Sequence, residues 1–362
     1  MVTAIIFILV IGVLVLVHEF GHFIFAKRAG MKVEEFGFGF PPRMFGIKRG
    51  ETIYSINWIP FGGFVKILGE DGDDRSERSF ASKPILARLK VILAGVVMNL
   101  LLAVVLLMVV NFFGLRIGLI DEAQNDDIRD RQIQIITVSE NSPASAADFR
   151  QLDAVESIRL ADGSVVLPKT TSELREVILS QTGREMVVTL KRGSQVLEKR
   201  VTPRENPPEG QGALGVSLAA TGVVSYPWYE AIWRGVYSTY ILTVNTAIGY
   251  YSLLKTLLIQ GRLISEVSGP IGIAGLTGQA AQVGINYLLQ FVALISVNLA
   301  VLNILPFPAL DGGRAVLLGV EKIKGSPIHK RTEGLINVIG FYLLILLMIY
   351  VTIKDIVRFT KF

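Results

Sequence analysis

Three long stretches without Asp, Glu, Lys or Arg constrain the fold of this chain most. They are Val91–Leu115, Val267–Leu310 and Gly334–Ile353. A helix needs about 20 apolar residues to cross the hydrocarbon core of a bilayer. Only 19% of the 362 residues are charged, whereas about a quarter are charged in soluble domains. We therefore predict a polytopic α-helical membrane protein, which excludes a collagen, a disordered chain and a purely cytosolic enzyme.

Four segments are predicted to span the membrane: Val2–Ala26, Val91–Leu115, Asn286–Leu305 and Leu335–Ile353. We expect the first to be a retained span and not a signal peptide, because no basic residue precedes its apolar core and no small-residue cleavage site follows it. Residues 228–260 are apolar but interrupted by polar residues. They either span the membrane or lie along its surface as an amphipathic helix.

Basic loops set the expected orientation. Residues 27–90 contain twelve Lys and Arg, and residues 320–333 form a second basic loop; such loops stay in the cytoplasm. Met1, Phe362 and residues 116–225 are then expected outside the cytoplasm. The net charge of +5 suits anionic lipid, and no pattern indicates nucleic acid. Cys is absent, so no disulfide and no thiolate metal site exists.

The segment between the second and third spans is predicted to be a small α+β domain. Short strands are expected at Ile133–Val138, Ala154–Leu160, Met186–Lys191 and Val196–Val201, and a helix is expected at Ser172–Ser180. Pro203–Gly212 is predicted to be a linker, and Ser268–Gly278 an irregular glycine-rich segment. In the first loop, alternation over Thr52–Ile59 predicts a strand, which we expect to pair with an extended peptide.

His18-Glu19-Phe20-Gly21-His22 carries the chemistry at the end of the first span. Two His four residues apart lie on one face of a helix. This spacing is typical of a zinc site in which two imidazoles bind Zn²⁺ and the Glu between them activates a water. His329, beside Lys330, is expected to be a solvated surface residue.

A third ligand is needed, since catalytic zinc usually has three protein ligands. Asp311 follows the 44-residue uncharged stretch, in the setting Asn303-Ile-Leu-Pro-Phe-Pro-Ala-Leu-Asp311-Gly-Gly313. The prolines break the helix and the glycines allow unusual dihedral angles. If the third span runs inward, Asp311 reaches the cytoplasmic half of the membrane, where His18 is expected. Shared ligation therefore predicts that residues 228–260 do not cross completely.

These motifs resemble the site-2 protease family of intramembrane zinc metalloproteases, and most closely the bacterial regulator of sigma-E protease group. Further matching pieces are Phe36-Gly37-Phe38-Gly39, Gly62-Gly63-Phe64-Val65-Lys66, Ala94-Gly95 with Asn99, and Ser268-Gly269-Pro270-Ile271-Gly272. The resemblance implies an α-helical membrane protein with a membrane-associated β-loop and one inserted PDZ-like domain. The expected parts are residues 1–115 and 286–362 in the membrane, 116–212 as the PDZ-like domain, and 213–285 as membrane-surface helices.

The resemblance also implies an activity and a set of site residues. His18, His22 and Asp311 would bind Zn²⁺, and Glu19 would be the catalytic base. Contacts to the substrate or to the oxyanion would come from Asn303, Asn99, Pro306, Gly37 and Gly39. The resemblance further implies a location in a bacterial cytoplasmic (inner) membrane. The substrates would be single-pass membrane proteins, such as an anti-sigma factor or remnant signal peptides, with an upstream site-1-type protease left open as a partner.

Two departures from the family pattern are visible. Val96 follows Ala94-Gly95 where the family usually has Pro. In the PDZ-like domain, Asn141–Ala144 fits a Gly-Ser-Pro-Ala turn, but Ala147–Asp153 lacks the two usual glycines. The sequence therefore leaves open whether this domain binds a peptide or filters substrates by size.

Two other functional classes remain as alternatives. Intramembrane His, Glu and Asp also mark ion pathways, so a metal or ion transporter is one alternative; the lack of a repeat argues against it. A non-catalytic membrane scaffold is the other, and the intact Glu19 argues against it.

Overall fold

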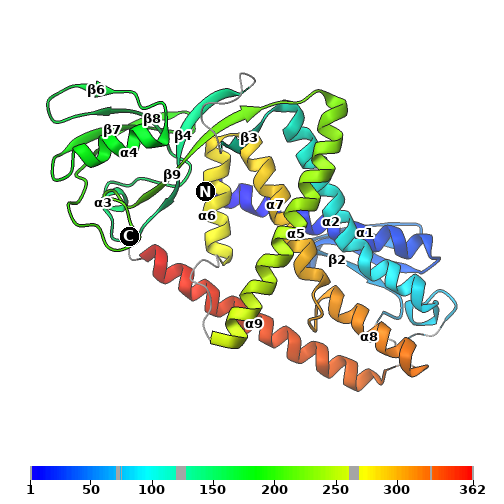
Figure 1. Ribbon diagram of the computed structural model, residues 1–362. Helices are drawn as coiled ribbons and strands as arrows, with labels where there is room; N and C mark the ends of the chain where they lie inside the picture. The colour runs from blue at the N-terminus through cyan, green and yellow to red at the C-terminus, as the bar shows by residue number, and fades with distance from the viewer. Residues whose placement is uncertain are drawn as a thin grey trace. The chain divides into compact units, whose positions relative to one another are not determined.

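The computed structural model describes residues 2–70, 74, 76–119, 128–260, 269–326 and 328–360. The chain forms two compact units. Unit 1 comprises residues 1–108, 232–278 and 289–362, and unit 2 comprises residues 109–231 and 279–288. Figure 1 shows the helices and strands of both units.

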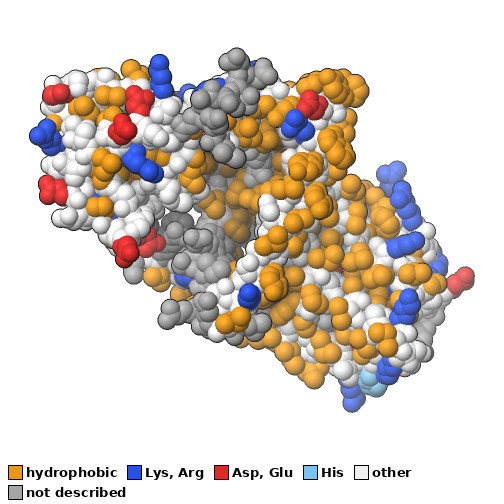
Figure 2. Space-filling view, viewed as in Figure 1, with side chains coloured by type: hydrophobic (Ala, Val, Ile, Leu, Met, Phe, Trp, Pro, Cys, Tyr) orange, Lys and Arg blue, Asp and Glu red, His pale blue; other side chains and the backbone are white. Residues whose placement is uncertain are grey.

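Long helices dominate unit 1, and four of them also contribute residues to unit 2. The helices are α1 (Val2–Arg28), α2 (Ile85–Phe113), α5 (Trp228–Gln260), α6 (Pro270–Val283), α7 (Ile285–Ile304), α8 (Asp311–Lys324) and α9 (Lys330–Thr360), with a short 3₁₀ turn at Phe80–Ser82. Four of the described helices are long and apolar enough to cross a membrane, namely α1, α2, α7 and the Arg331–Val357 part of α9. The four predicted spans are thus confirmed by length and composition. Figure 2 shows apolar side chains covering much of this unit's visible face, with Lys and Arg along its right-hand and lower edges.

The spans α2 and α9 are each longer than the uncharged stretch that predicted them. α2 begins at Ile85, six residues before Val91, and includes Arg88. The Arg88 guanidinium donates to the Glu321 carboxylate of α8 at 2.9 Å, and both side chains are mostly buried. A paired charge is tolerated at a helix end, so charge alone placed the boundary too late.

α5 packs against two of the four candidate spans. Leu242 and Tyr250 contact a buried cluster from α2 and α7, and the Tyr250 hydroxyl donates to Asn298 of α7 at 3.4 Å. Near its start, Gly235 lies against Met108 of α2. α5 is long enough to cross a membrane but is not among the helices selected as spans, so its course relative to the membrane stays a prediction.

The expectation of an irregular segment at Ser268–Gly278 is wrong for the residues that the structure describes, because Pro270–Val283 is helical. Proline suits the first turn of a helix, where its missing N–H is not needed. The free N–H groups of Gly269 and Gly272 donate to the buried carboxylate of Asp355 in α9, at 3.1 and 2.8 Å. This cap from a distant helix was not visible in the local sequence. Ser268 lies outside the described residues.

A β-sheet follows α1, built from β1 (Val33–Arg49) and β2 (Thr52–Ile67). Both strands bend, so their halves form four adjacent segments. Residues 52–56 pair with residues 45–49 on one edge and with residues 35–38 on the other. The second edge of residues 33–38 pairs with residues 63–67. The prediction of a strand at Thr52–Ile59 is therefore confirmed, but its expected role in peptide pairing is wrong, since both its edges are occupied. Residues 63–67 have a second edge that no described strand covers.

Unit 2 is built on a mixed-length antiparallel sheet with strand order β3-β9-β4-β5-β7-β8 and β6 beside β5. The strands are β3 (Leu115–Gly118), β4 (Arg129–Val138), β5 (Ala154–Arg159), β6 (Val165–Val166), β7 (Met186–Arg192), β8 (Gln195–Val201) and β9 (Val216–Val224), with helices α3 (Pro143–Ala146) and α4 (Thr171–Ser180). The four predicted strands and the helix are confirmed within a few residues. Sequence analysis missed β9, which pairs with both β3 and β4 although it lies beyond the predicted boundary at residue 212.

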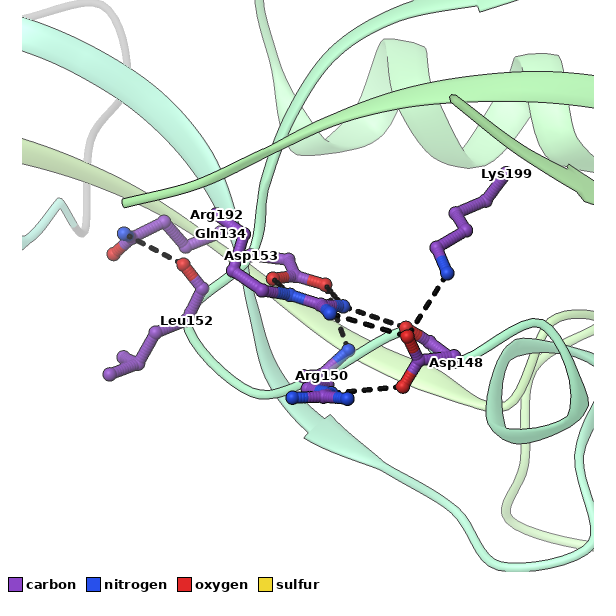
Figure 3. A network of polar contacts seen from close by, with 7 residues as sticks. All are labelled: Gln134, Asp148, Arg150, Leu152, Asp153, Arg192 and Lys199. Atoms are coloured by element: carbon purple, nitrogen blue, oxygen red, sulfur yellow. Dashed lines mark hydrogen bonds and ion pairs between the residues drawn. The ribbon is translucent and has the colours of Figure 1, made fainter. Parts of the chain in front are cut away.

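The two glycines missing from Ala147–Asp153 correspond to strained backbone positions. Asp148 and Leu152 adopt φ of +58° and +71°, a region that suits glycine. Burial alone would raise the pKa of Asp148, but hydrogen bonds from Lys199, Arg150 and Arg192 lower it to about 2. These bonds hold the strained turn in place (Figure 3).

Asp153 completes this network from the fully buried interior. Its carboxylate accepts bonds from the Arg150 backbone N–H at 2.9 Å and from Arg192 Nε and Nη2 at 2.7 and 2.8 Å. It therefore joins the turn before β5 to the neighbouring strand β7. Breaking a buried ion pair by removing one partner typically costs about 3–5 kcal/mol.

We expect Asp153→Ala to destabilise unit 2 by about 3 kcal/mol or more, because Arg192 loses its buried partner. Denaturant-dependent proteolysis of residues 128–224 in the detergent-solubilised protein would measure this loss. The control is Glu198→Ala, which removes the exposed ion pair with Arg159 and should change stability by about 0–1 kcal/mol. Equal effects of the two substitutions would contradict the assignment.

Candidate active site

The final turns of α1 place His18 and His22 side by side. Both imidazoles are buried, with 7% and 8% exposure, and their Nε2 atoms are 3.2 Å apart. The i, i+4 spacing puts them on one helix face, as the sequence predicted. His22 Nδ1 donates to the backbone carbonyl of Val91 in α2 at 2.8 Å. His22 therefore directs its Nε2 lone pair toward His18.

Asp311 approaches the same point from the other end of the chain. Its Oδ2 lies 3.2 Å from His18 Nε2 and 3.5 Å from His22 Nε2. α7 ends at Ile304, and Asp311 is the first residue of α8. The residues between them form a tight turn that packs on α9, where Gly340 leaves space for Pro308.

Gly312 and Gly313 are needed for a different reason from the one expected. Both are in helical backbone, and the left-handed residue in this turn is Ala309, with φ of +69°. A Cβ on Gly312 would meet the Ile304 and Leu305 carbonyl oxygens, and one on Gly313 would meet that of Phe307. The glycines therefore permit close approach of the backbone, and through it they set the position of Asp311.

Glycines also bring α1 and α2 into near contact at the site. A Cβ on Gly21 would lie 2.5 Å from the Ala94 carbonyl oxygen. A Cβ on Gly95 would lie 2.6 Å from both His18 Cε1 and His22 Nε2. Small residues at membrane helix crossings allow such close packing. The Ala94-Gly95 piece thus has a steric function directly behind the two imidazoles.

The donor set fits a metal cation. One ligand atom each from His18, His22 and Asp311 lies within 4.8 Å of the other two. Asp311 Oδ2 is buried and, among the described residues, has no hydrogen bond of acceptable geometry. Three acceptor atoms that converge without a donor are satisfied by a shared cation, and two imidazoles with a carboxylate suit zinc.

A cavity of about 120 Å³ adjoins these three residues. Glu19 lines it, as do Glu70 and Arg314, which pair with each other at 2.5 Å. Sequence analysis missed Glu70 and Arg314. Arg314 follows Asp311 by three residues and so shares its helix face, a signal that could have found it; nothing in the sequence indicated Glu70.

The residues expected to contact substrate do not line this cavity. Asn303 and Pro306 flank the end of α7. Gly37 and Gly39 lie in the sheet, where a Cβ would meet Ser55 Oγ at 2.6 Å or the Ile59 carbonyl oxygen at 2.5 Å. Close strand packing therefore explains both glycines. Asn99 is fully buried and lies 3.3 Å from His18 Nδ1.

Comparison with known proteins gives a consistent result. The family model described as peptidase family M50 matches residues 6–347. A Clostridium perfringens protein with the name "Putative zinc metalloprotease" is 38% identical over 97% of both chains. The Bacillus subtilis protein named regulator of sigma-W protease RasP is 30% identical over 98% of both chains. The zinc metalloprotease RasP of Oceanobacillus iheyensis is 28% identical over 99% of both chains.

We expect Gly95→Ala to lower the metal affinity by about 10–100-fold or more. This is the loss that usually follows when a group that positions a metal ligand is changed. The added methyl group would displace both imidazoles, although alanine favours the helix by about 1 kcal/mol. Metal content after dialysis against graded chelator would measure the effect. Gly249→Ala in α5, where a Cβ meets open space, is the matched control and should bind like the wild type. Normal binding by Gly95→Ala would refute the steric assignment.

Proposed function

The chain belongs to peptidase family M50 and is an intramembrane zinc metalloprotease, and we propose that His18, His22 and Asp311 bind its zinc while Glu19 is the general base. The convergence of two imidazoles and one carboxylate from segments almost three hundred residues apart is the observation that carries this proposal. It is supported by the cavity beside them, which has room for water and includes Glu19.

Peptide hydrolysis follows from these positions. When bound, zinc supplies Lewis acidity, which activates a water and polarises the scissile carbonyl. Glu19 takes a proton from the attacking water, whose oxygen bonds to the carbonyl carbon. The C–N bond then breaks, and Glu19 passes the proton to the leaving amine. Water and peptide are converted to a carboxylic acid and an amine, and Glu19 returns to its starting state.

The substrate is a membrane protein, and we assign it to single-pass proteins whose helix unwinds locally. A helix hides its peptide bonds, so the substrate has to become extended near the site. The edge of residues 63–67 in β2 that no described strand covers is suited to pair with it, because Val65 and Ile67 line the cavity and Gly63 lies against Glu19. Strand addition on this edge would present the extended substrate to the zinc ligands.

The sheet of β1 and β2 is assigned to the membrane surface. Its exposed large side chains include Met44, Phe45, Ile47, Ile56 and Trp58. Such a row of apolar residues suits the boundary between headgroups and acyl chains. This placement would bring that edge of residues 63–67 to the depth at which a membrane substrate arrives.

Unit 2 is assigned as a PDZ-like domain on the outer side of a bacterial cytoplasmic membrane. Its antiparallel sheet, the helix α4 and the Ser142–Ala146 turn support this assignment. A groove of about 740 Å³ between its strands and residues 167–170 offers space for a peptide. Peptide binding and size filtering both remain compatible with this domain.

The substrates are assigned to the class cleaved in regulated proteolysis. The Bacillus subtilis relative is named for sigma-W regulation, and by analogy an anti-sigma factor fits this chain. Remnant signal peptides fit equally, because they are also short single membrane helices. Prior trimming by an upstream protease would let the remaining stub pass unit 2.

Glu19→Gln is expected to lower cleavage by about 10²–10⁴-fold, since the amide cannot accept the water's proton. Zinc content should stay at the wild-type level, because Glu19 is not a proposed ligand. Fragment mass after co-expression with single-pass proteins would measure cleavage, with Glu198→Gln in unit 2 as control. Undiminished cleavage would refute the assignment of Glu19 as the general base. Zinc flux across vesicle membranes would favour the transporter alternative.

Substrate helix strength should control the rate. Replacing a glycine of the substrate span by leucine raises helix stability by about 1 kcal/mol, so the unwound population and the cleavage rate should fall roughly fivefold. Matched substrates differing at this one position would test it in a gel-based time course. Equal rates would show that unwinding does not limit cleavage.

A further inference from the structure

Asn99 of α2 occupies a buried position directly behind the site. Its side chain is fully buried, and its amide lies 3.3 Å from His18 Nδ1, the ring nitrogen turned away from Asp311. Its backbone carbonyl accepts a hydrogen bond from Ser296 of α7 at 2.7 Å, and Ser296 is also fully buried. Asn99 thus connects three helices: α1, α2 and α7.

The two ring nitrogens of His18 have separate tasks. Nε2 faces Asp311 and His22, so Nε2 is the atom that could bind a metal and must carry no hydrogen there. A neutral imidazole then carries its hydrogen on Nδ1. His22 is arranged in this way, since its Nδ1 donates to the Val91 carbonyl. His18 needs a comparable acceptor opposite its Nδ1.

The Asn99 amide can supply that acceptor. Among the described residues, its Oδ1 has no hydrogen-bond partner although the atom is buried. The amide oxygen and nitrogen have nearly the same shape, so a half-turn of the amide exchanges their positions. Oδ1 then lies beside His18 Nδ1 and accepts its hydrogen. Metal-binding histidines usually donate their second N–H to such a group, which fixes the tautomer and the ring orientation.

We propose that Asn99 is a positioning residue that holds His18 in the tautomer that binds zinc through Nε2. This inference rests on the proposed zinc site. It replaces the expected role of Asn99 in substrate contact, because the residue lies behind His18 and does not line the cavity.

The test compares two substitutions. Asn99→Leu has a similar size but no hydrogen-bond acceptor, whereas the ionised carboxylate of Asn99→Asp accepts hydrogen bonds and donates none. Zinc affinity of the purified full chain in detergent is measured by chelator competition, and the visible spectrum of the Co²⁺-loaded protein reports ligand geometry. Asn99→Leu should bind zinc about 10–100-fold more weakly with an altered Co²⁺ spectrum. Asn99→Asp should bind at least as tightly as the wild type with an unchanged spectrum.

Asn298→Leu is the matched control, since Asn298 lies in α7 and its hydrogen bonds within the described part of the chain are to Leu294 and Tyr250; it should retain the wild-type affinity. Wild-type affinity and spectrum in Asn99→Leu would overturn the proposal. If Asn99→Leu does not fold, a tenfold loss of zinc affinity in Asn99→Asp would overturn it independently. A wild-type chain that binds no zinc would instead refute the proposed zinc site itself.

Discussion

The near contact between α1 and α2 is the constraint on which the site depends. His18 and His22 are carried by α1, and Gly95 of α2 faces them. Because Gly95 has no side chain, the two imidazoles occupy the volume that a larger residue would fill. The same crossing lets the Val91 carbonyl and the Asn99 amide reach the outer nitrogens of the rings. Close packing of two apolar helices thus determines where the polar atoms of the site can be.

Asp311 is positioned by a second set of close approaches, and these involve other helices. The turn after α7 folds so tightly that Gly312 and Gly313 touch its carbonyl oxygens, and Gly340 of α9 receives Pro308. α8 is then held by two ion pairs, from Arg88 to Glu321 and from Arg314 to Glu70. In surroundings of low polarity, paired charges of this kind are costly to separate. These contacts together hold the turn and the start of α8 that carry Asp311.

Much of this organisation could be predicted from the sequence, because it follows from local patterns. Uncharged stretches predicted the spans, the His-Glu-x-x-His spacing predicted one face of α1, and Asp311 stood out as a carboxylate after a long uncharged segment. The failures involve contacts between distant residues. Both edges of Thr52–Ile56 are paired through bends in β1 and β2, the start of α6 is capped by Asp355, and Glu70 meets Arg314 across almost 250 positions. No local pattern encodes such partners.

The cap on α6 has a consequence for how the end of the chain is connected to its middle. Asp355 lies a few residues before the end of α9, yet its carboxylate satisfies the backbone of the segment that leads into α6 and α7. Loss of the Asp355 carboxylate would release that segment, and with it the support for the approach of Ser296 in α7 to Asn99 in α2. The carboxyl-terminal helix therefore supports the backbone that leads to the candidate site, in addition to being long and apolar enough to cross a membrane.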